Sequence, residues 1–170
     1  ICWDLGERSS SAWGDYDNDG YTDLLITGAN AFYDTGTSRI YHNNNGDGTF
    51  TLQSNISITG VKNSSASWAD YNNDGFLDFL ISGWDSNYNR ITKIYRNNGN
   101  GTFTDINAFI RGVVGGNVTW GDYDNDGDLD ILMCGVSSKV INVIYRNDGD
   151  DTFTEQLYGF HQVTQGYSSF

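Results

Sequence analysis

Apolar and polar residues alternate in short runs along this chain, and each run ends at a cluster of Asn, Asp or Gly. In the middle of the chain these runs cover residues 65–71, 78–84, 91–96 and 102–106. Alternation with a period of two predicts strands, and Asn-Gly clusters between such runs predict hairpins. The sequence shows no sustained period of 3.6 residues, so we expect an all-β fold with almost no helix.

Two sequence segments recur in the same order three times. The first reads W-G-D-Y-D-N-D-G-Y-T-D from Trp13, W-A-D-Y-N-N-D-G-F-L-D from Trp68 and W-G-D-Y-D-N-D-G-D-L-D from Trp120, at intervals of 55 and 52 residues. The second, which reads Y-R-N-N-G-N-G-T-F in the middle copy, covers residues 41–50, 95–103 and 145–153. Four antiparallel strands repeated at this interval predict β-propeller blades. A β-sandwich is the alternative, but it would not place the same loop in every unit.

The repeat divides the chain into three blades and the beginning of a fourth. We expect one propeller-type region over residues 1–170, with repeats at about 9–63, 64–116 and 117–165. Phe170 follows Phe153 by 17 residues, as Trp120 follows Phe103, so residues 166–170 are expected to be the first strand of a fourth blade. Propellers have about four to eight blades. We therefore expect either a longer polypeptide or several copies that complete one another.

The acidic residues of the chain gather in the recurring loop. The formal net charge is −13, and the acids cluster around Asp15, Asp70 and Asp122. Each loop has the form D-x-[DN]-x-D-G-x-x-D, in which alternate side chains can converge and Gly supplies the sharp turn. Converging carboxylates repel one another unless a cation lies between them. The alternative is a set of Asn/Asp/Gly turns without a metal.

The donor types in these loops favour calcium. Every side-chain donor is a hard oxygen and no His or Cys lies nearby in the sequence, which disfavours zinc, copper and iron. We expect about three Ca²⁺ ions. EF-hands are excluded, because strands flank the loops and no Glu stands at position 12. The candidate ligands are Asp15, Asp17, Asp19 and Asp23 with the backbone of Tyr21; Asp70, Asn72, Asp74 and Asp78 with the backbone of Phe76; and Asp122, Asp124, Asp126 and Asp130 with the backbone of Asp128.

The paired motifs, W-x-D-Y-[DN]-N-D-G-x-x-D followed by Y-[RH]-N and G-x-x-T-F, resemble the FG-GAP/VCBS repeat. That repeat builds the β-propeller of integrin α subunits, and related propellers occur in fungal lectins and microbial surface proteins. The resemblance implies Ca²⁺ in the loop between the first two strands of several blades, held at the positions given above. The chain departs from the pattern at Asn72, in the Trp-Gly pairs that replace the first tripeptide, and in having no Pro.

The remaining composition limits which partners and which cellular location we expect. The nine Lys and Arg residues are scattered, which argues against nucleic acid. No apolar run is long enough to insert into a membrane. Ligand sets of this kind suit millimolar calcium, so we expect an extracellular or cell-surface protein.

The expected function is a calcium-binding structural or adhesion module that contacts other protein chains or copies of itself, including as a subunit of a surface assembly or filament. The alternatives are a lectin-like propeller that binds glycans and a non-catalytic scaffold domain of a secreted enzyme. We expect no enzymatic activity, since His42 and His161 are solitary in the sequence and His42 takes the place of Arg96 and Arg146, an ordinary strand position.

Several other residues carry weaker expectations. The recurring Trp13, Trp68 and Trp120 are expected to pack between blades. Cys134 is expected to be a buried thiol, and Cys2 to find any partner outside this segment. Candidate ligand-surface aromatics are Trp3, Tyr33, Trp84 and Tyr88, and candidate glycosylation sites are Asn55, Asn63, Asn100 and Asn117.

Overall fold

The computed structural model describes residues 9–30 and 35–156, which form β strands and no helix. The first sheet contains β1 (Ser10–Gly14), β2 (Asp23–Asn30), β3 (Thr35–Asn43) and β4 (Phe50–Leu52). The second contains β5 (Lys62–Ala69), β6 (Asp78–Trp84), β7 (Arg90–Asn97) and β8 (Phe103–Asp105). The third contains β9 (Val114–Gly121), β10 (Asp130–Val136), β11 (Val140–Asn147) and β12 (Phe153–Gln156). The strand expected at 166–170 lies outside the described residues.

Each sheet is an antiparallel meander of four strands in chain order, which confirms the predicted blade. The register is the same in all three sheets at the point where the acidic loop begins and ends. Gly14 pairs with Asp23, Ala69 with Asp78, and Gly121 with Asp130. The loop between the first two strands therefore leaves every blade at the same place.

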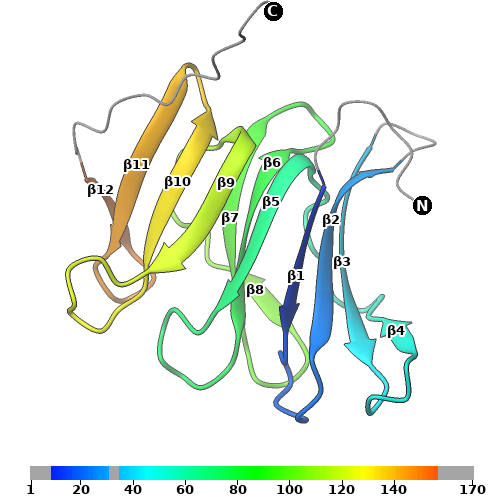
Figure 1. Ribbon diagram of the computed structural model, residues 1–170. Coiled ribbons are helices and arrows are strands. Elements are labelled where there is room, and N and C mark those ends of the chain that lie inside the picture. The colour runs from blue at the N-terminus through cyan, green and yellow to red at the C-terminus, as the bar shows by residue number, and fades with distance from the viewer. Residues whose placement is uncertain (1–8, 31–34, 157–170) are drawn as a thin grey trace, which may run out of the picture.

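The three sheets stand side by side, with β1 next to β5 and β5 next to β9 (Figure 1). Apolar side chains fill the two spaces between them, and the middle blade is covered on both faces. Its central strand β6 is accordingly buried over almost its whole length, whereas the alternation persists in the outer blades. Ile81 is 0% exposed, but the matching Ile26 of the first blade is 37% exposed.

Two of the three recurring tryptophans, Trp68 and Trp120, pack between blades as predicted, whereas the prediction is wrong for Trp13. Trp68 stacks on Tyr16 of the preceding blade at 6.3 Å, and Trp120 stacks on Tyr71 at 5.6 Å. Each indole N–H also donates a hydrogen bond to a backbone carbonyl of the preceding blade, at 3.2 and 3.4 Å. Trp13 lies on the open face of the first sheet, beside Phe50, and is 61% exposed. Among the described residues, Trp68 and Trp120 are therefore inter-blade contacts, and Trp13 contacts its own blade.

The strands β9 and β10 approach each other closely at the ends away from the acidic loop. A Cβ on Gly116 would lie 1.9 Å from the carbonyl oxygen of Cys134, so only glycine fits there. The register of the pair shifts between Cys134 and Val136. Cys134 itself is half-buried with a free thiol, less buried than expected.

Candidate functional site

The three acidic loops share one backbone conformation. Asn18, Asn73 and Asn125 each have φ of 59°, and the glycines that follow two residues later have φ of 90°, 89° and 95°. This left-handed region is accessible to Asn and Gly at low cost. The first Asp of each loop accepts hydrogen bonds from the amides at positions 5 and 6, which closes the turn.

The ninth residue of each loop is a buried aspartate that ties the loop to the third strand. Asp23 and Asp78 are 0% exposed and Asp130 is 1% exposed. In each case one carboxylate oxygen accepts the amide of the loop tyrosine, and the other accepts the amide of the Asn that ends the third strand. These bonds fix the buried carboxylate at the base of the loop.

Asparagines link the loops of neighbouring blades. Asn97 donates its side-chain amide to the carbonyl of Tyr16 at 2.7 Å, and Asn147 donates to that of Tyr71 at 3.1 Å. At the loop tips, the Asn at position 4 donates to the loop Gly carbonyl of the next blade, at 2.9 Å from Asn18. The three loops therefore form a connected row along one edge of the stacked blades.

Negative charge accumulates in these loops. Burial raises the pKa of Asp78 to about 7, although backbone hydrogen bonds from Asn97 and Tyr71 oppose the shift. Burial likewise raises the pKa of Asp17, Asp23 and Asp130. Carboxylates whose ionised form is disfavoured in this way gain from a bound cation, which restores the charged form.

The structure brings several of the predicted ligands within metal-binding distance of one another. In the first and third loops, three carboxylates offer oxygens that all lie within 4.8 Å of one another, and these groups could hold a metal ion. They are Asp15, Asp17 and Asp19 in the first loop and Asp122, Asp124 and Asp130 in the third.

The second loop has an amide at its third position. Asn72 donates to Asp74 Oδ2 at 2.9 Å and accepts the amide of Asp74 at 3.1 Å. Its oxygen and that of Asp70 remain donors of the hard type that calcium binds. We expect this loop to bind calcium more weakly than the third, since it carries one carboxylate fewer.

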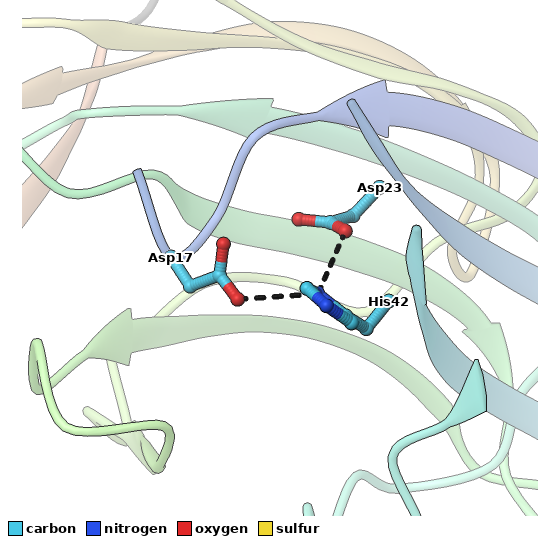
Figure 2. Close-up of side chains that lie close together, drawn as sticks. All are labelled: Asp17, Asp23 and His42. Atoms are coloured by element: carbon cyan, nitrogen blue, oxygen red, sulfur yellow. Dashed lines mark ion pairs between the residues drawn. The ribbon is translucent and has the colours of Figure 1, made fainter. Parts of the chain in front are cut away.

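His42 joins the first loop, which sequence reasoning missed. Its Nδ1 lies 3.2 Å from Asp17 Oδ2 and 3.4 Å from Asp23 Oδ1 (Figure 2). The expectation that only oxygen donors surround the loops is therefore wrong for the first loop of the folded chain. The position of His42 in the structure explains the contact, because His42 directly precedes Asn43, whose backbone amide donates to Asp23. His42 is not an ordinary strand position.

The other candidate residues are spread over the surface. The ring centroids of Trp84 and Tyr88 lie 6.5 Å apart, and each ring has a cation over one face. Arg90 lies 4.6 Å from the centroid of Trp84, and Lys62 lies 4.4 Å from that of Tyr88. Trp3, Tyr33, Cys2 and His161 lie outside the described residues.

Of the four candidate glycosylation sites, Asn55 and Asn100 are exposed and Asn63 is half-buried. Asn117 is exposed and accepts a hydrogen bond from Ser65. Glycosylation stays a prediction at all four. The described part of the chain contains no helix that is long and apolar enough to cross a membrane.

Comparison with known proteins agrees with this repeat pattern. The family model of the FG-GAP-like repeat matches residues 15–81 and 70–133. Each match begins at the first aspartate of an acidic loop and extends past the loop of the next blade. Searches of the curated proteins and of the solved structures found no match.

Proposed function

The chain belongs to the FG-GAP-like repeat family, and from this premise we propose that it is a calcium-stabilised β-propeller module that binds other proteins outside the cell. Repeats of this family are typical of propeller-like protein–protein interaction modules. The proposal gives the blades the role of a rigid scaffold, and the loops and blade edges the role of the contact surface.

The observation that carries the calcium assignment is the threefold recurrence of one acidic loop at one place in the blade. Each loop presents hard oxygen donors above a buried aspartate, and consecutive loops are hydrogen-bonded to each other. Calcium takes six to eight such donors in flexible geometry, whereas Mg²⁺ keeps most of its water. Bound ions would also offset the repulsion within a chain of net charge −13.

Location outside the cell follows from the calcium assignment. Loops with these donor sets are suited to calcium at about 0.1–1 mM, the range typical of extracellular modules. We propose that the partners are other protein chains or copies of this one, and that the module performs no chemistry itself. Glycan binding has less support, because the rings of Trp84 and Tyr88 each already hold a cation on one face.

Isothermal titration of the metal-free chain with Ca²⁺ tests the assignment. The third loop is the sharpest target, and Asp124→Asn should remove or weaken one binding event without unfolding the chain, since Asp124 is exposed. Asp47→Asn is the matched control, because Asp47 is an exposed hairpin aspartate outside the loops whose side chain accepts hydrogen bonds from Thr49 alone among the described residues. Equal calcium binding by the two variants would refute the assignment of the third loop.

A further inference from the structure

The first acidic loop differs from the other two in the imidazole that approaches it. His42 extends from β3 and places Nδ1 between the carboxylates of Asp17 and Asp23 (Figure 2). We propose that Asp17, Asp23 and His42 form a site for a divalent transition metal of the zinc type. The first blade then carries a metal centre of different chemistry from the all-oxygen loops of the second and third blades.

The separations between the donor atoms match a tetrahedral metal site. Nδ1 is 3.2 Å from Asp17 Oδ2 and 3.4 Å from Asp23 Oδ1, and all three ligand atoms lie within 4.8 Å of one another. Two donors at about 2.0–2.1 Å from zinc and at the tetrahedral angle lie about 3.3 Å apart. Each carboxylate oxygen therefore already lies from Nδ1 at about the distance that a shared zinc ion requires, and a water would take the fourth position.

The Nδ1 atom is itself buried and lacks a hydrogen bond. It has no partner of hydrogen-bonding geometry among the described residues, although two carboxylates are near. A buried polar atom without a partner costs free energy. A metal ion between the ring nitrogen and the two carboxylates would satisfy all three groups at once.

The surrounding structure holds these donors in place. Asp23 is fully buried, and its carboxylate accepts the backbone amides of Tyr16 and Asn43. His42 Nε2, the nitrogen on the other side of the ring, lies 3.8 Å from Asp19 Oδ2. A carboxylate facing the second nitrogen of a ligating imidazole is a common feature of zinc sites, where it orients the ring.

The equivalent residues of the other blades show that this arrangement is particular to the first. Arg96 points across to the third blade, where it pairs with Asp151 at 2.7 Å. Arg146 pairs with Asp148 in its own hairpin. A guanidinium is not a metal ligand at neutral pH, because it stays protonated. The substitution of His for Arg therefore adds a nitrogen donor in one blade only.

The choice of metal follows from the mixed donor set. Imidazole nitrogen suits zinc and its neighbours in the first transition row, whereas calcium is bound by oxygen alone. The inference replaces the proposed calcium ion in the first loop only, because Asp17 and Asp23 would bind zinc together with His42, a donor from outside the loop. Calcium binding by the second and third loops and zinc binding by the first can fail separately.

Visible absorption of Co²⁺ tests the site, because four-coordinate cobalt absorbs strongly where six-coordinate cobalt does not. The metal-free chain is titrated with Co²⁺ in the presence of excess Ca²⁺, and the cobalt is then displaced with Zn²⁺. We expect one strongly absorbing Co²⁺ per chain, displaced by one equivalent of Zn²⁺. His42→Asn should lose this absorption, and His161→Asn, which alters the other histidine of the chain, should keep it.

The same variants give the expected size of the effect. Loss of a group that merely orients a ligand lowers metal affinity about 10- to 100-fold, so loss of the ligand itself in His42→Asn should lower Zn²⁺ affinity by at least about 100-fold. Equal Zn²⁺ affinity in His42→Asn and the unaltered chain would overturn the proposal. So would the absence of strongly absorbing Co²⁺ in excess Ca²⁺, which would make the first loop a calcium loop like the others.

Imidazole ¹⁵N resonances test the site without any substitution, in case His42→Asn does not fold. The chain has two histidines, so the spectrum is readily assigned. We expect Zn²⁺ to shift the Nδ1 resonance of His42 at one equivalent. A His42 ring whose nitrogens do not respond to Zn²⁺ would overturn the proposal and leave the cluster as a metal-free contact between an imidazole and two carboxylates.

Discussion

Replacement of Asn97 by alanine should weaken the contact between the first and second blades and lower the stability of the fold. Asn97 is 3% exposed, and its side chain makes three hydrogen bonds: it donates to the carbonyls of Tyr16 and Leu77 and accepts the amide of Gly99. The bond to Tyr16 crosses between blades. Asn97→Ala deletes all three bonds and leaves buried carbonyls without a donor.

The magnitude follows from these bonds. Each contributes about 0.5–1.5 kcal/mol net, so the free energy of unfolding should fall by about 2–4 kcal/mol. With a urea dependence of about 1–3 kcal/mol per molar, the unfolding midpoint should fall by about 1 M or more. Tryptophan fluorescence and circular dichroism, measured on the same samples, follow the transition.

The first blade supplies the matched control. Asn43 occupies the equivalent position, but its side chain donates only to Thr22 and accepts the amide of Gly46, both within its own blade. It is also only half-buried. Asn43→Ala should lower the free energy of unfolding by about 1 kcal/mol less than Asn97→Ala does, because it removes no hydrogen bond to a neighbouring blade. If the two variants lose the same stability, the bond between blades contributes nothing and the reasoning is refuted.

Three further predictions test packing, close approach and charge. Trp68→Ala should lower the free energy of unfolding in urea by about 3–5 kcal/mol and Trp13→Ala by much less, because the indole of Trp68 is packed on the preceding blade and that of Trp13 is exposed. Equal losses of stability would contradict this. Gly116→Ala should lower the melting temperature sharply and Gly121→Ala should not, because only the first Cβ would meet a carbonyl. Finally, burial raises the pKa of Asp78 to about 7, so its protonated form favours folding below about pH 4 and this stability is lost as the pH rises to about 7. The urea midpoint of the metal-free chain should fall as the pH rises over this window. If the midpoint of Asp78→Asn falls with pH in the same way, Asp78 is excluded as the cause.

The blades could be predicted from the sequence because their signals are local and repeated. Alternating runs bounded by Asn-Gly turns predicted four strands per unit, and the recurring Trp68 and Trp120 predicted contacts between units. Both are confirmed by the sheets and by the stacking on the preceding tyrosine. The spacing of the acidic loop predicted the convergence of Asp15, Asp17 and Asp19 and of Asp122, Asp124 and Asp130, since a tight turn leaves its alternate residues few directions.

What the sequence did not reveal depends on contacts between distant segments. His42 reaches the first loop only because β3 pairs with β2 so that residue 42 lies beside Asp23, and the motif of the loop itself carries no trace of this. The contact from Asn18 to the loop of the next blade was missed for the same reason. Within its own loop Asn18 reads as a turn residue with positive φ, and its side-chain partner lies 57 positions away.

The most direct test of the central claim is thermal unfolding of the chain with calcium and after removal of metal, with bound ions counted by native mass spectrometry. At about 100 times the dissociation constant, each ion should stabilise the fold by about 2.7 kcal/mol. We therefore predict a large rise in melting temperature with Ca²⁺, accompanied by bound ions in the acidic loops. An unchanged melting temperature with no ion bound would contradict the account and leave the loops as metal-free turns.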